Sequence, residues 1–148
     1  MPTVFSLANG VRVAITTNDH CPPHVHAVHQ GEGWLVRVEF SFVHARVRVH
    51  SIEPTPGAVR QRQLNRLLQA VEGQLAACRR VWWTIRGTTC LENKWLVMQS
   101  DGMSVAEEAS PNARRVKGAY YDSDADFTKI AFRVGGNVTI AGTRGEPM

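Results

Sequence analysis

The sequence predicts an α+β fold in which an N-terminal antiparallel sheet carries a packed helix or helical hairpin and is followed by a small β-rich unit. Apolar residues alternate with polar ones over much of residues 3–50, and then recur at helical spacing over residues 55–86. Short alternating runs return beyond residue 88. We therefore expect an α+β domain at residues 1–87 and a β-rich unit, packed on it, at residues 88–148.

The first part of the chain predicts a meander with one apolar face. An Asn9-Gly10 pair separates residues 3–7 from residues 11–16, and Asn-Gly between apolar runs is a strong hairpin signal. The clearest strand spans residues 34–42, where every second side chain is aromatic or a valine. The expected sheet is completed by residues 24–29 and 44–50.

The helical region begins at Thr55, which can cap a helix with Pro56 in its first turn. Gly73 interrupts the region, so one kinked helix or two short helices are both compatible with it. Its apolar stripe, which we expect to pack against strand 34–42, consists of Leu64, Leu67, Leu68, Val71, Leu75 and Cys78.

The C-terminal part contains several short runs that indicate strands. A turn is expected at Ser100-Asp101-Gly102, and the Asp122–Asp126 segment, with carboxylates at every second position, indicates a solvated loop rather than a calcium site. The expected strands are residues 95–98, 103–105, 116–121, 127–134 and 138–140.

Composition places the 148-residue chain among ordinary globular proteins, with 43% hydrophobic residues. No apolar run approaches the roughly 18 residues that span a bilayer. The N-terminus has no basic start followed by a long apolar stretch, so we expect no secretory leader and no membrane partner. Cys21, Cys78 and Cys90 lack CxxC spacing, which favours reduced thiols and a cytoplasmic location.

The net charge of +4 comes from the middle of the chain. Residues 57–86 contain six arginines and one acid, Glu72, whereas the flanking segments are nearly balanced. A positive surface of this kind is suited to nucleic acid or to an acidic protein partner, although solvated arginines on a helix face give the same pattern. The candidate binding residues are Arg46, Arg48, Arg60, Arg62 and Arg66, with Arg46 and Arg48 in a basic row that also includes His44 and His50.

Histidines gather in one short stretch, Asp19-His20-Cys21-Pro22-Pro23-His24-Val25-His26. His24 and His26 share a face if they lie on a strand, and the proline pair can turn His20 back towards them. Three converging imidazoles with Asp19 would suit zinc, so His20, His24, His26 and Asp19 are candidate metal ligands. The same three histidines are candidate catalytic residues for metal-free acid–base chemistry, such as RNA cleavage. Histidines that only hydrogen-bond within the sheet are a third interpretation.

This stretch resembles the hallmark D-H-x-P-P-H-x-H of a small prokaryotic family catalogued as domain of unknown function 4160, and the resemblance extends over residues 1–86. Residues 115–141 more weakly resemble domain of unknown function 2442, although Gly135-Gly136 stands where that family has an aspartate. Both families are associated with toxin–antitoxin-like and mobile-element cassettes, and neither implies an established activity.

The expected function is therefore that of a cytoplasmic component of a toxin–antitoxin-like or defence-related system that engages nucleic acid or a nucleoprotein partner through its basic surface. One alternative is a small histidine-site enzyme, most simply a ribonuclease, with or without metal. Another is a protein-binding inhibitor or assembly module.

Overall fold

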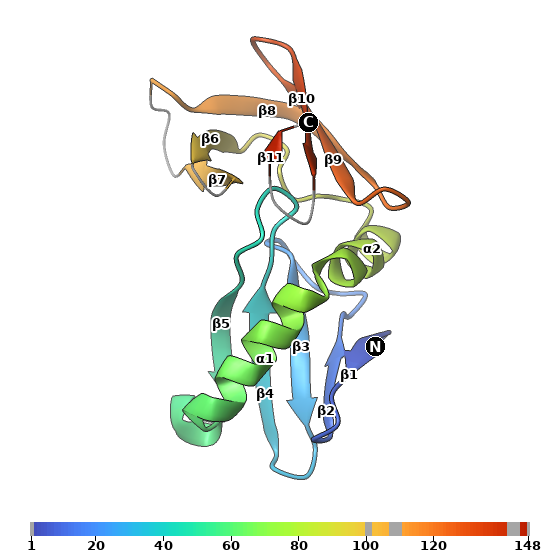
Figure 1. Cartoon of the computed structure of the whole chain (residues 1–148), viewed down its shortest axis with the longest axis vertical. Coiled ribbons are helices and arrows are strands. Elements are labelled where there is room, and N and C mark those ends of the chain that lie inside the picture. Colours follow the sequence, from blue (N-terminus) through green and yellow to red (C-terminus); the bar gives the residue numbers. More distant parts are fainter. Residues whose placement is uncertain (1, 100–101, 107–110, 142–145, 148) are drawn as a thin grey trace.

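The computed structural model describes residues 2–99, 102–106, 111–141 and 146–147, and it has the α+β architecture expected from the sequence. A five-stranded sheet has the order β1-β2-β3-β4-β5, and a six-stranded sheet has the order β11-β10-β9-β8-β6-β7. In Figure 1, α1 crosses one face of the first sheet, and α2 lies beside the end of that sheet that meets the second one.

The first sheet is the antiparallel meander that the alternating pattern predicts. Its strands are β1 (Thr3–Ser6), β2 (Val11–Ala14), β3 (His24–His29), β4 (Trp34–Glu39) and β5 (Arg48–Glu53). In the β3–β4 ladder, His24 is opposite Glu39 and His26 is opposite Arg37. The core face carries Val25 and Ala27 of β3, both fully buried.

The strand expected at residues 44–50 is displaced, because β5 begins only at Arg48. The preceding residues bond to other parts of the chain instead of to β4. His44 forms an isolated bridge with Gly102, and the Val43 carbonyl accepts the Met103 N–H at 3.2 Å. The Phe42 carbonyl accepts the Thr128 hydroxyl at 2.8 Å. This segment therefore belongs to the junction between the sheets.

Two short helices follow a single 3-10 turn, so the region is not one kinked helix. The turn is η1 (Pro56–Ala58), and the helices are α1 (Gln61–Gly73) and α2 (Leu75–Arg86). Gly87 ends α2 in the left-handed conformation at φ 63°, where glycine carries no Cβ penalty. Of the expected stripe, Leu67, Val71, Leu75 and Cys78 are buried in the core that also contains Trp34 and Val36, whereas Leu64 and Leu68 are only half-buried.

The second sheet contains all the strands expected from the sequence and one more. They are β6 (Trp95–Gln99), β7 (Gly102–Ala106), β8 (Arg114–Asp122), β9 (Phe127–Phe132), β10 (Asn137–Ala141) and β11 (Glu146–Pro147). Strand β8 is long enough to pair with β9 along most of its length and with β6 through Arg114 and Arg115. The expected turn at Ser100-Asp101 lies outside the described residues.

A buried arginine joins α2 to the second sheet. Arg79 is 0% exposed, and its guanidinium donates to the Ser41 carbonyl at 2.9 Å, to the His44 carbonyl at 3.0 Å and to Asp126 Oδ2 at 3.2 Å. Tyr121 donates its hydroxyl to Asp126 Oδ1. Two causes raise the pKa of Tyr121: burial has the larger effect, and the hydrogen bond to the Asp126 carboxylate adds to it. The expectation of a solvated 122–126 loop is therefore wrong at Asp126, which is the buried counter-ion of Arg79.

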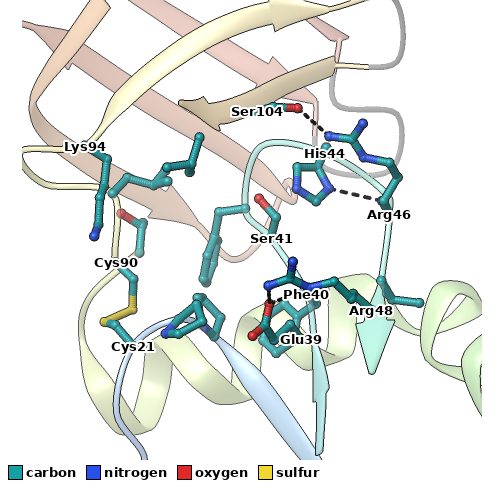
Figure 2. A pocket seen from close by; sticks show the side chains of 17 residues that line it. Cys21, Glu39, Phe40, Ser41, His44, Arg46, Arg48, Cys90, Lys94 and Ser104 are labelled. Atoms are coloured by element: carbon teal, nitrogen blue, oxygen red, sulfur yellow. Dashed lines mark hydrogen bonds and ion pairs between the residues drawn. A yellow bond between two sulfur atoms is a disulfide. The ribbon is translucent and has the colours of Figure 1, made fainter. Parts of the chain in front are cut away.

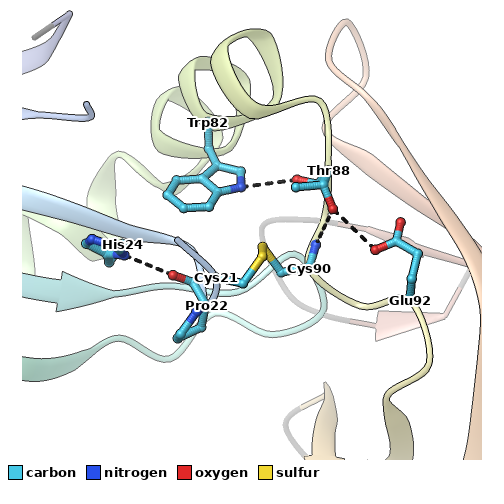
Figure 3. Close-up of a disulfide and its surroundings, with 7 residues drawn as sticks. All are labelled: Cys21, Pro22, His24, Trp82, Thr88, Cys90 and Glu92. Carbon is cyan, nitrogen blue, oxygen red and sulfur yellow. Dashed lines mark hydrogen bonds between the residues drawn. A yellow bond between two sulfur atoms is a disulfide. The ribbon is translucent and has the colours of Figure 1, made fainter. Parts of the chain in front are cut away.

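A disulfide joins Cys21 to Cys90, with 5.7 Å between their Cα atoms, as Figure 3 shows. The expectation of three reduced thiols is wrong for this pair, because the fold brings together two cysteines 69 residues apart. Cys78 is a free cysteine in the core, and burial raises the pKa of its thiol to about 12. Among the described residues, no helix has the length and apolar character needed to cross a membrane.

Replacing Leu67 by alanine should lower the free energy of unfolding by about 2–5 kcal/mol, because the substitution leaves a cavity in the core. The exposed Asn65→Ala is the control and should change stability by less than about 0.5 kcal/mol. Urea denaturation measures both, and equal effects would show that α1 does not pack on the sheet.

Replacing Arg79 by alanine should cost about 3–5 kcal/mol, because Asp126 would be left as a buried charge without its partner. Arg80→Ala is the matched control: that side chain is exposed and donates to the Ser123 carbonyl at 2.8 Å. Thermal and urea unfolding should show a clearly larger loss of stability in Arg79→Ala than in Arg80→Ala. Similar small losses in both variants would mean that the buried pair does not hold the sheets together.

Candidate metal centre and the adjoining cleft

A carboxylate and two imidazoles converge where the loop after β2 enters β3. Asp19 Oδ1 lies 2.7 Å from His26 Nε2 and 3.5 Å from His24 Nε2. One ligand atom from each residue lies within 4.8 Å of the other two. His24 and His26 share a face of β3, as the two-residue period of a strand predicts. The group Asp19, His24 and His26 is called the metal centre below, because it could hold a metal ion.

Backbone contacts within the loop position the carboxylate. The Thr16 N–H donates to Asp19 Oδ2 at 2.7 Å, which leaves Oδ1 directed at the imidazoles. Burial on its own would raise the pKa of Asp19, but hydrogen bonds from Thr16 and His26 outweigh it, so the pKa lies below its ordinary value. Asp19 is therefore a carboxylate at neutral pH, the form that a cation requires.

The proline bend sets the tautomer of His24. Its Nδ1 lies 2.9 Å from the Pro22 carbonyl, which can only accept, so Nδ1 carries the proton. In the neutral ring, Nε2 then holds the lone pair, on the side facing Asp19. Metal-bound histidines usually donate their other ring N–H to a carbonyl or carboxylate in this way. Figure 3 shows this contact beside Trp82, whose ring centroid lies 5.7 Å from that of His24.

The spacing of the ligand atoms is compatible with a tetrahedral cation. Two atoms bound to one zinc ion at about 2.0–2.2 Å lie roughly 3.3–3.6 Å apart. The His24–Asp19 separation of 3.5 Å already fits, and the His26–Asp19 pair at 2.7 Å would open slightly on binding. Side chains of His24, His26 and Asp19 are 14%, 9% and 7% exposed. A cation can reach such a group, whereas the phosphate of a polymer has little access to it.

His20 is exposed and stands outside the metal centre. The Pro22-Pro23 bend directs His24 inward, but it does not turn His20 back towards the pair. Of the three histidines that the sequence predicts to converge, the structure brings two together.

A second polar group, which no sequence pattern connects to the histidine motif, continues from His24. The His24 and His50 rings stack with centroids 6.5 Å apart, and His50 Nδ1 lies 2.7 Å from Glu39 Oε1. Arg48 donates to Glu39 Oε2 at 2.7 Å. The alternating pattern of the sequence predicted that Arg48 and His50 share a basic row. Their partner Glu39 is identified only by the strand pairing, which places it opposite His24 in β3 and Arg48 in β5.

Glu39 also lines a cleft of about 690 Å³ between the two sheets, called the inter-sheet cleft below. Figure 2 shows Lys94 and the disulfide on one side of it and Arg46 and Arg48 on the other. Arg46 donates to the Ser104 hydroxyl of β7. The polar residues of its lining are Glu39, Ser41, His44, Arg46, Arg48, Thr89, Lys94 and Ser104.

The basic residues of segment 57–86 and of the row before it, Arg46 and Arg48, do not form one surface. Arg79 is buried, and Arg86 donates to the Thr17 carbonyl at 2.8 Å. Arg46 and Arg48 lie at the inter-sheet cleft, at the start of β5, whereas α1 begins beyond the far end of that strand (Figure 1). The exposed arginines at and near the start of α1 are Arg60, Arg62 and Arg66, called the α1 arginines below.

Comparisons with protein-family models, with curated proteins and with solved structures give no match. The two family resemblances at the histidine motif and in the second sheet remain predictions.

Zinc should bind the purified protein at one site, and His24→Ala or Asp19→Asn should lower its affinity by at least about tenfold, the loss usual when a site loses one ligand or an outer partner. His20→Ala is the matched control and should bind zinc normally. Isothermal titration of protein pretreated with a chelator measures all four proteins. Loss of zinc in His20→Ala, or unchanged affinity in His24→Ala, would contradict this centre.

Proposed function

We propose that this chain engages nucleic acid or a nucleoprotein partner through the α1 arginines, and that the metal centre holds a zinc-class cation that stabilises the fold. The exposed positive charge of Arg60, Arg62 and Arg66 carries the proposal. Apart from Glu72 near its end, α1 contains no acidic residue, and Glu32 of the β3–β4 turn lies near Arg60. Arginines in this arrangement can follow a phosphate backbone without reading bases.

The role assigned to the cation follows from the burial of its ligands. Asp19 comes from a loop and the two histidines come from β3, so a bound ion would link loop to sheet. Binding to the folded state alone stabilises that state by mass action. Low side-chain exposure favours this structural role over attack on a polymer.

A small histidine-site enzyme, a ribonuclease in the simplest form, is the second candidate. The contact between His24 Nδ1 and the Pro22 carbonyl favours it, because in the neutral ring it leaves Nε2 as the atom that could take a proton. His50, Glu39 and Arg48 would then supply an acid and a phosphate contact at the edge of the inter-sheet cleft. In that case His24→Ala should abolish RNA cleavage, whereas substitution of the α1 arginines should only weaken binding.

Membership of a toxin–antitoxin-like or defence-related system, and a cytoplasmic location, belong to the same proposal. They are supported by the resemblance of the histidine motif to a family found in such cassettes. The Cys21–Cys90 disulfide is the one observation that opposes the cytoplasmic part of this proposal, because disulfides rarely persist in a strongly reducing compartment.

The double reversal Arg62→Glu with Arg66→Glu should weaken binding of a generic RNA or DNA oligonucleotide by roughly tenfold or more and reduce its salt dependence. The two positions are four residues apart on one helix face. Fluorescence anisotropy at several salt concentrations measures both quantities.

The control is Lys117→Glu with Lys129→Glu, which changes the net charge equally on exposed positions of the second sheet. It should bind nearly as the parent does. Equal losses of affinity in the two double variants would show that net charge, and not the α1 surface, determines binding. Absence of salt-sensitive binding by the parent would reject the proposal and favour a protein-binding module.

A further inference from the structure

Thr89, in the lining of the inter-sheet cleft, has a buried hydroxyl that lacks a partner among the described residues. The residue is 1% exposed, and its Oγ1 makes no hydrogen bond within the part of the chain that the structure describes. Its neighbour differs: the Thr88 hydroxyl accepts the Cys90 N–H at 3.0 Å and donates to Glu92 at 3.2 Å (Figure 3). Because buried polar groups are nearly always hydrogen-bonded, an unpaired hydroxyl beside a cleft indicates that a ligand in the cleft supplies the partner.

Positive charge surrounds the same cleft. Arg48 uses Nε and Nη2 on Glu39 Oε2, at 3.2 and 2.7 Å, and a guanidinium has further donors beyond these two groups. Lys94 is exposed, and its ammonium takes part in none of the ion pairs found among the described residues. Arg48 and Lys94 outnumber Glu39, the single carboxylate among the described residues of the lining. The excess favours an anionic ligand.

The remaining walls are apolar, and the cleft is too large for an inorganic anion alone. Its volume of about 690 Å³ lies within the range of roughly 300–1,000 Å³ typical of small-molecule sites. A ligand that fills it needs an apolar body as well as a charged group. The apolar lining consists of Pro22, Pro23, Phe40, Phe42, Val47, Leu91 and Val105.

We propose that the inter-sheet cleft binds a nucleotide. Arg48 and Lys94, which line opposite sides of the cleft, attract the phosphate, and the base lies against the apolar walls. The Thr89 hydroxyl bonds to the polar edge of the ligand. Such a site goes beyond the proposed function, because it lies apart from the α1 arginines and needs no metal. A free mononucleotide and the phosphorylated end of a single strand share this chemistry.

Isothermal titration of the full chain compares adenosine 5′-monophosphate, adenosine, inorganic phosphate and a 5′-phosphorylated oligoadenylate. We expect the monophosphate to bind at least tenfold more tightly than adenosine or phosphate. Tighter binding of the oligoadenylate that persists in the Arg62→Glu with Arg66→Glu variant would identify a strand end as the source, and equal or weaker binding in that variant would identify the free nucleotide. Absence of binding by both phosphorylated ligands, or equal binding of adenosine, would overturn the proposal.

Variants of the cleft separate ligand contact from folding. Thr89→Val keeps the side-chain shape. Because the Thr89 hydroxyl has no partner in the described part of the chain, the melting temperature should not fall, whereas nucleotide affinity should drop several-fold. Thr89→Ser should retain affinity, Lys94→Glu should lose at least tenfold, and the exposed Lys117→Glu is the charge control. Normal affinity in both Thr89→Val and Lys94→Glu would overturn the site.

The Arg62→Glu with Arg66→Glu double variant separates this proposal from the proposed function. It should bind the mononucleotide normally even where it fails to bind long nucleic acid. Loss of mononucleotide binding in that variant, with the fold intact, would place the nucleotide site on α1 and overturn its assignment to the cleft.

Discussion

The arrangement of the two sheets depends on one buried guanidinium. Arg79 donates to two carbonyls of the segment before β5 and to Asp126 of the second sheet, so a single side chain connects three parts of the fold. A buried charge is tolerated only when its partners are complete, which makes the junction specific in geometry. The inter-sheet cleft exists because this junction, together with the Thr128 contact to the Phe42 carbonyl, holds the sheets at one separation.

The loop between β2 and β3 brings the two candidate sites together. Its Asp19 belongs to the metal centre, and its Pro22 and Pro23 line the inter-sheet cleft. His24 is opposite Glu39 in the sheet, so the metal centre and the cleft are contiguous through one cross-strand pair. A change in the position of this loop would therefore affect both sites at once.

Short-range patterns in the sequence predict much of this structure, whereas contacts between distant residues escape them. Alternation predicted the strands and the shared face of His24 and His26, and helical spacing predicted the burial of Leu67 and Val71. Helical spacing places Arg79, unlike the exposed Arg80, on the stripe of Leu75 and Trp82, but no local pattern supplies its counter-ion, because Asp126 is 47 residues away. The late start of β5, the pairing of Cys21 with Cys90 and the outward position of His20 likewise depend on tertiary contacts.

The Cys21–Cys90 bond closes a ring of chain that contains β3, β4, β5 and both helices. A peptide bond cleaved anywhere inside that ring leaves the two fragments covalently attached. The nicked protein would therefore migrate as one species on a non-reducing gel and separate into two only after a thiol is added. Both termini lie outside the ring, so trimming of either end releases material under any redox condition.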